Sequence, residues 1–140
     1  MTIRWDDKLK VGNLEIDSDH RELVSLINDF EIEAKSASGI DRHRIQVTLE
    51  RLQLYAHDHF AREEYIQAVA KYAGLEENRR QHLALRKTLA EYIRKFNADE
   101  FADAAAAAAE MSAFLDDWLM THIVEVDLKM RGAMTVEQWR

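Results

Sequence analysis

The chain contains no proline, and this absence limits its fold more than any other feature of the sequence. Glycine, the other common helix breaker, occurs only four times, at positions 12, 39, 74 and 132. Alanine, leucine, glutamate, lysine and arginine, which all favour helices, are abundant. We therefore expect a few long helices rather than a sheet.

Helical periodicity marks the first two of these helices. Asp17 or Ser18 is expected to cap the first helix, whose apolar stripe fades at 35–39. The second helix is expected to begin near Asp41 and to run to about Lys71, since apolar residues recur three or four positions apart throughout that stretch.

Two further helices follow Gly74. The third is expected to run from about Glu76 to Phe96. Asn97 or Asp99 is expected to cap the fourth, which would end near Gly132, a residue suited to the position after a helix.

Four amphipathic helices joined by short loops predict an all-α, up-down-up-down four-helix bundle. The first ten residues, which include Trp5, are expected to form an N-terminal arm along the bundle. We expect residues 1–140 to form a single domain, because the length is ordinary for one domain and the sequence shows no linker.

Composition excludes several classes of function. The chain has no cysteine, so disulfides, thiolate metal sites and cysteine nucleophiles are ruled out. A net charge of −7 argues against a nucleic-acid surface. We see no signal peptide, and the longest apolar run is too short to span a membrane, so we expect a cytoplasmic protein with no membrane partner.

Polar residues interrupt the apolar stripes where leucine would be expected. They are His20, His59, Glu63, His82 and His122. A single inward histidine is most often a hydrogen-bonded core residue, but four of them, one on each helix, favour a metal site, because burying such groups without partners costs several kcal/mol. His59 and Glu63 are four residues apart, so both side chains reach one point beside their helix.

The expected helix boundaries give a check on depth. His20 and His59 lie at levels that differ by only about 3 Å along the bundle, at 1.5 Å per residue. The levels of His82 and His122 do not match, so either a boundary of the fourth helix is misplaced or that helix extends past its neighbour.

Three segments resemble the hemerythrin family, and especially its single-domain bacterial members, the bacteriohemerythrins. They are V-G-N-L-E-I-D-S-D-H-R-E-L-V at 11–24, H-F-A-R-E-E at 59–64 and W-L-M-T-H-I-V-E-V-D at 118–127. The resemblance extends over nearly the whole chain. It implies that the metal ligands are His20, His59, Glu63, His82, His122 and Asp127, with Glu63 and Asp127 bridging two metals.

Asp127 does not fit ideal helical spacing, and Asn78 does not fit the family pattern. Five residues of ideal helix turn about 500°, so spacing alone would place Val126 on the side of His122, and Asp127 is assigned from the resemblance. The family carries a histidine where this chain has Asn78, four residues before His82. An amide oxygen is a weaker donor to iron than imidazole, so Asn78 is a doubtful ligand.

The resemblance implies two iron ions, joined by an oxo or hydroxo bridge, that bind dioxygen for storage, delivery or sensing. Nitric oxide or azide would be other small ligands. The expected walls of the oxygen pocket are Leu23, Ile27, Phe60, Leu119 and Ile123. Two alternatives remain open: a di-iron redox enzyme, such as a peroxidase, nitric oxide reductase or ferroxidase, and a bundle with a partial or lost metal site. Manganese or zinc would also suit these ligands.

Overall fold

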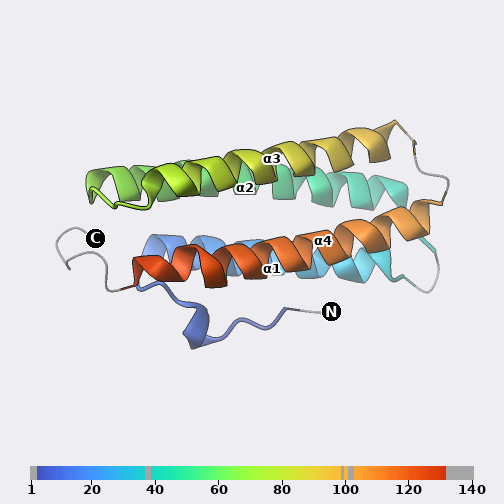
Figure 1. The fold of residues 1–140 in the computed structure, drawn as a ribbon. Helices are drawn as coiled ribbons and strands as arrows, with labels where there is room; N and C mark the ends of the chain where they lie inside the picture. The colour runs from blue at the N-terminus through green and yellow to red at the C-terminus, as the bar shows by residue number, and fades with distance from the viewer. Residues whose placement is uncertain (1–2, 37–38, 99, 101–102, 132–140) are drawn as a thin grey trace.

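The computed structural model describes residues 3–36, 39–98, 100 and 103–131. Within these ranges the chain forms four long helices and two short 3-10 helices. They are η1 (Asp7–Leu9), α1 (Leu14–Ala34), α2 (Arg42–Val69), α3 (Leu75–Asn97), α4 (Ala104–Glu125) and η2 (Asp127–Met130). The long helices alternate in direction, and α1–α2, α2–α3, α3–α4 and α4–α1 are neighbours (Figure 1). The predicted all-α, up-down-up-down bundle is confirmed.

Side-chain caps explain where three of the helices begin. The second helix begins at Arg42, next to the predicted start, and Asp41 caps it by accepting a hydrogen bond from a backbone N–H of the first turn. The predicted cap of α1 on Asp17 or Ser18 is wrong, because Asn13 performs this role four residues earlier and accepts a hydrogen bond from Ile16 N at 3.0 Å.

The boundaries predicted for the fourth helix are also wrong. Asn97 is the last residue of α3, and Asp99 lies outside the described residues. Asp103 caps α4 instead, accepting hydrogen bonds from two backbone N–H groups. The helix ends at Glu125 rather than near Gly132, which lies outside the described residues.

The described part of the N-terminal arm lies along the bundle, as predicted. Its backbone is held at one end by Asn28, which exchanges two hydrogen bonds with Ile3, and at the other by Asp17, which accepts hydrogen bonds from Val11 and Gly12. Gly12 has a φ of 101°, a left-handed conformation that glycine adopts without strain.

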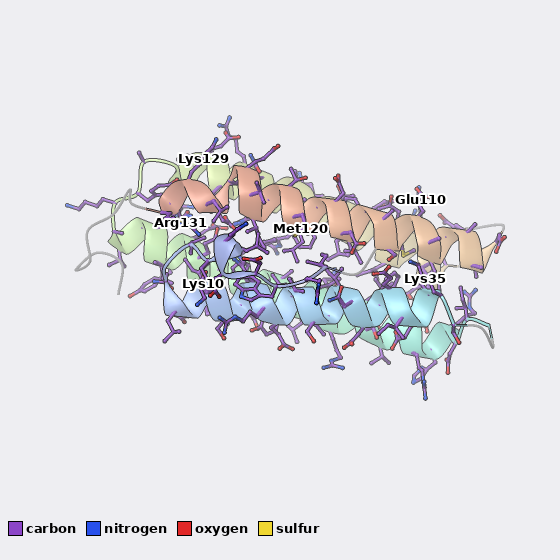
Figure 2. The ribbon with its side chains drawn as sticks, turned by 90° about the horizontal axis from the view of Figure 1, so that it is seen from below. Lys10, Lys35, Glu110, Met120, Lys129 and Arg131 are labelled. Atoms are coloured by element: carbon purple, nitrogen blue, oxygen red, sulfur yellow. The ribbon has the colours of Figure 1, made fainter. Side chains whose placement is uncertain are left out.

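The far end of the chain also contacts this arm. Arg131, just after η2, donates hydrogen bonds to the backbone carbonyls of Lys8 and Lys10 (Figure 2). Hydrogen bonds therefore join the arm both to the start of α1 and to the residue that follows η2.

The apolar stripes of the four helices meet in one core, which holds the bundle together by burial of apolar surface. Its largest fully buried side chains include Phe30, Phe96, Leu52 and Leu115. No helix in the described part of the chain is long and apolar enough to cross a membrane.

Candidate metal centre

The six predicted ligands and Asn78 converge inside the bundle. None of the seven side chains is more than 3% exposed: His20, His59, Glu63, Asn78, His82, His122 and Asp127. Each of the four helices contributes at least one of them, and η2 contributes Asp127. A set of buried ionisable groups this dense is stable only if the groups pair with one another or bind a cation.

These side chains form two groups that share one carboxylate. Subsite A is made of His20, His59, Glu63 and Asp127, and subsite B of Glu63, His82 and His122. Within each group the possible ligand atoms all lie within 4.8 Å of one another.

Both carboxylates face the two subsites with different oxygens. Glu63 Oε2 lies 3.1 Å from His59 Nε2 and 3.6 Å from His20 Nε2, whereas Oε1 lies 3.5 Å from His82 Nε2. Asp127 Oδ2 lies 2.9 Å from His20 Nε2, and its Oδ1 lies 3.2 Å from His122 Nε2. Each carboxylate is therefore placed to bridge two cations, one in each subsite.

The spacing and bonding of these atoms fit a metal centre. Two donors bound to one metal at about 2.1 Å lie roughly 3 to 3.5 Å apart, and the distances here run from 2.9 to 3.6 Å. Several of these atoms are buried without a hydrogen-bond partner among the described residues: His20 Nε2, His59 Nε2, Glu63 Oε2 and both carboxylate oxygens of Asp127. Divalent cations would satisfy the lone pairs of these atoms together.

The end of α4 explains how Asp127 enters the site. Val126 leaves the helix with a φ of −115°, and the chain continues into the 3-10 helix η2. A 3-10 helix turns by a larger angle per residue than an α-helix. Asp127 rather than Val126 therefore points into the bundle, next to His122. Asp127 therefore lies beside His122, where the resemblance implied it and ideal helical spacing did not.

The later start of α4 reduces the mismatch in depth between His82 and His122. Their Nε2 atoms lie 3.1 Å apart, so both imidazoles are at the same level of the bundle. The misplaced cap of the fourth helix accounts for most of the discrepancy.

Asn78 reaches the centre but presents its amide nitrogen to it. Its Nδ2 donates a hydrogen bond of 2.6 Å to Glu63 Oε1, and its Oδ1 has no hydrogen-bond partner among the described residues. The reverse orientation would set the amide oxygen against a carboxylate oxygen, two acceptors with no proton between them. In this geometry Asn78 holds the Glu63 carboxylate and does not add a donor to subsite B.

Two carboxylates outside the predicted set orient the histidines. Asp19 Oδ2 lies 2.9 Å from His59 Nδ1, and Glu64 Oε2 lies 2.8 Å from His82 Nδ1. In both cases Nε2 is left facing the centre, an arrangement typical of metal-binding histidines. The sequence reasoning missed both residues, although each stands directly beside a predicted ligand, in the segments D-S-D-H and H-F-A-R-E-E.

Asp19 is itself the centre of a network. Arg62 donates two hydrogen bonds to it, of 2.9 and 2.8 Å, and the Tyr55 hydroxyl donates a third. Burial alone would raise the pKa of Asp19, but the hydrogen bonds from His59 and Arg62 lower it well below its ordinary value. Asp19 is therefore a firmly ionised partner for His59.

We predict that these two supporting carboxylates act on different subsites. Asp19→Asn should weaken metal binding at subsite A by about 10–100-fold, and Glu64→Gln should do the same at subsite B, because each change loosens one histidine. Titration of each variant against a chelating dye measures both affinities. The two variants serve as controls for each other, and weakening of the same subsite by both would contradict the prediction.

The charges in the metal-free centre stabilise one another. Burial would lower the pKa of His20, but Asp127 and Glu63 overcome this effect and raise it to about 10. Burial would raise the pKa of Glu63, but the neighbouring imidazoles of His20, His59 and His82 lower it well below its ordinary value. Without metal, protons on the imidazoles provide the positive charge that the carboxylates require.

The family model described as the hemerythrin HHE cation binding domain matches residues 12–133, which span every residue of this centre. The chain is a member of the hemerythrin family. Among its curated relatives is a bacteriohemerythrin of Stenotrophomonas maltophilia, 29% identical over 85% of this chain and 72% of that protein. A myohemerythrin of Riftia pachyptila is 29% identical over 91% of this chain and 90% of its own length.

Solved structures agree on the fold. A crystal structure of wild-type hemerythrin superposes with a TM-score of 0.82 at 23% identity, covering 95% of this chain and 98% of the other. The four helices and the short elements at either end of this chain are thus the hemerythrin fold.

Proposed function

We propose that the chain binds two iron ions, one in subsite A and one in subsite B, and that this pair binds dioxygen reversibly. The proposal depends on the placement of the carboxylate oxygens: Glu63 and Asp127 each have one oxygen toward subsite A and the other toward subsite B. A site for one cation would not need either carboxylate to be shared. Membership of the hemerythrin family supports iron over zinc or manganese.

A bound iron pair supplies the electrons for dioxygen binding, and the chain supplies the surroundings. The predicted pocket walls are all buried in the core around the centre: Leu23, Ile27, Phe60, Leu119 and Ile123. We propose that they exclude water and leave room only for small ligands, such as dioxygen, nitric oxide or azide.

The test is metal analysis combined with visible absorption. Reduced, iron-loaded protein should contain two irons per chain, gain a visible band on exposure to oxygen and lose it again when oxygen is removed. Less than one iron per chain would overturn the proposal. Two irons with irreversible oxidation would leave the centre in place but reject oxygen carriage.

A di-iron redox enzyme is the second candidate, and Asn78 is the observation that favours it. Because Asn78 donates to Glu63 and contributes no imidazole, subsite B has only two histidines and the two shared carboxylates as protein donors. A metal with fewer protein ligands keeps positions for exchangeable ones. Turnover of peroxide or nitric oxide by the iron-loaded protein would decide for this alternative.

We predict that Asn78→His strengthens metal binding at subsite B by at least about tenfold, since an imidazole would replace a group that contributes no lone pair to the metal. Iron retained after dialysis against a chelator measures the effect. Asn97→His, at the end of α3 and exposed, is the matched control. Unchanged retention in Asn78→His would show that position 78 does not reach the metal.

A further inference from the structure

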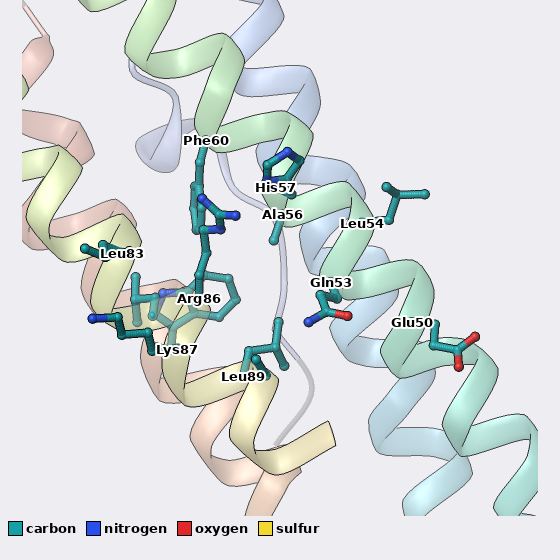
Figure 3. Close-up of a pocket in the computed structure, with 13 residues that line it drawn as sticks. Glu50, Gln53, Leu54, Ala56, His57, Phe60, Leu83, Arg86, Lys87 and Leu89 are labelled. Carbon is teal, nitrogen blue, oxygen red and sulfur yellow. The ribbon is translucent and has the colours of Figure 1, made fainter. Parts of the chain in front are cut away.

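A groove between α2 and α3 lies next to the metal centre but is not part of it. It has a volume of about 480 Å³, which is within the range of small-molecule sites in proteins. Figure 3 shows that the side chains lining it come mainly from the facing sides of these two helices. None of the candidate metal ligands lines it.

The floor of the groove is apolar, and apolar side chains also stand at its edge. Ala56, Phe60, Leu89 and Trp118 form the buried floor, each at most 6% exposed. Leu54 and Leu83 stand at the edge with 65% and 51% of their surface exposed. The groove therefore offers an apolar surface, and an apolar group that fills it would be stabilised by leaving water.

Charged side chains line the groove, with positive charge on Arg86 and Lys87 and negative charge on Glu50. Arg86 and Lys87 line it, and neither forms an ion pair with any described residue. Elsewhere on α3, by contrast, Arg79, Arg80 and Arg94 are each paired with a glutamate. In a chain with a net charge of −7, two adjacent unpaired cations beside an apolar floor are complementary to an anion.

The opposite end of the groove has the opposite charge. Arg86 and Phe60 lie toward one end and Glu50 toward the other (Figure 3). A ligand with one anionic group would place it at Arg86 and its apolar part over the floor. A ligand with anionic groups at both ends would bring the second one against Glu50.

We propose that this groove binds a small amphipathic monocarboxylate, with its carboxylate on Arg86 and a chain of medium length along the floor. Guanidinium and carboxylate groups form two parallel hydrogen bonds, so Arg86 provides direction as well as charge. The division of charge favours one carboxylate over two, and the volume favours a small molecule over a helix of a partner protein.

The groove also contacts the metal centre through one ring. Phe60 forms part of its floor and stacks on His82 with ring centroids 3.9 Å apart and an angle of 11° between the planes. A molecule bound in the groove would contact Phe60, which in turn packs against His82, a candidate metal ligand of subsite B.

The test uses decanoate as the probe and the full chain, with binding measured by isothermal titration calorimetry. Decanoate should bind with a stoichiometry of one. Arg86→Gln should weaken it by about tenfold or more, because a charge-assisted hydrogen bond is lost. Lys95→Gln, which removes the same charge from an exposed position further along α3, should leave the affinity unchanged.

Further experiments test where decanoate binds and which of its chemical groups the groove recognises. Ala90→Phe places a ring in the groove from an exposed position and should abolish binding, whereas Ala84→Phe, on α3 but outside the groove, should not. Decanedioate should bind more weakly than decanoate, and Glu50→Gln should reduce that difference. Equal affinity for decanol and decanoate, binding that survives Ala90→Phe, or no saturable binding would each overturn the proposal.

Discussion

Replacing Glu63 by glutamine should empty both subsites at once, reducing metal content from two ions per chain to less than one. Glu63 is the one residue common to both groups of possible ligands, and each of its oxygens faces a different subsite. The amide keeps the shape of the side chain but removes its charge, and its nitrogen has no lone pair for a metal. Metal analysis after gel filtration measures the loss.

A matched control separates this effect from the loss of any buried carboxylate. Glu31, on α1, is also only 3% exposed, but it bonds Lys35 and does not belong to the centre. Glu31→Gln should keep both metals. Circular dichroism should show a helical Glu63→Gln protein, and retention of one full equivalent of metal by it would contradict the shared bridge.

Metal loading at about pH 8 should release at least one proton per chain. In the metal-free protein the pKa of His20 is raised to about 10, so its imidazole is protonated at that pH, whereas a metal binds only the neutral ring. The pKa of His59 is also raised, despite its burial, by Asp19 and Glu63. Calorimetric titration with Zn²⁺ in two buffers of different ionisation enthalpy measures the protons released.

The same shifts set how the stability of the metal-free protein depends on pH. The charged form of His20 stabilises the fold fully below its ordinary pKa of 6.5, and this contribution is lost as pH rises toward about 10. For Glu63, whose pKa is lowered, the contribution is present above 4.5 and is lost as pH falls. Metal-free protein that is equally stable at pH 7 and pH 10, with no proton release on loading, would contradict this account.

The residues at the centre were predictable because each breaks a strong periodic pattern. His20, His59, Glu63, His82 and His122 occupy core positions of amphipathic helices, and the folded chain buries all five. Helix ends were less predictable, because several residues could serve as caps. Asn13 caps α1, whereas Asp17 accepts a hydrogen bond from the arm. Asp103 caps α4, and neither Asn97 nor Asp99 does.

What the sequence did not reveal depends on contacts between helices. Asp19 lies on α1 and supports His59 on α2, forty positions later in the chain. Asn78 was recognised as a departure from the family, but only the position of Glu63 shows which end of its amide faces the centre. The inward turn of Asp127 depends on a local break in the backbone at Val126, which no periodic pattern describes.

The position of Asp127 beyond the last turn of α4 affects how fast metal exchanges. Local opening of a short terminal segment requires far less free energy than separation of packed helices. Opening η2 alone would withdraw Asp127 from both subsites while the four long helices stay folded. Arg131 opposes that opening because it ties η2 to the backbone of the arm. Residues 8–10, far from Asp127 in sequence, would thus influence how long a bound metal stays.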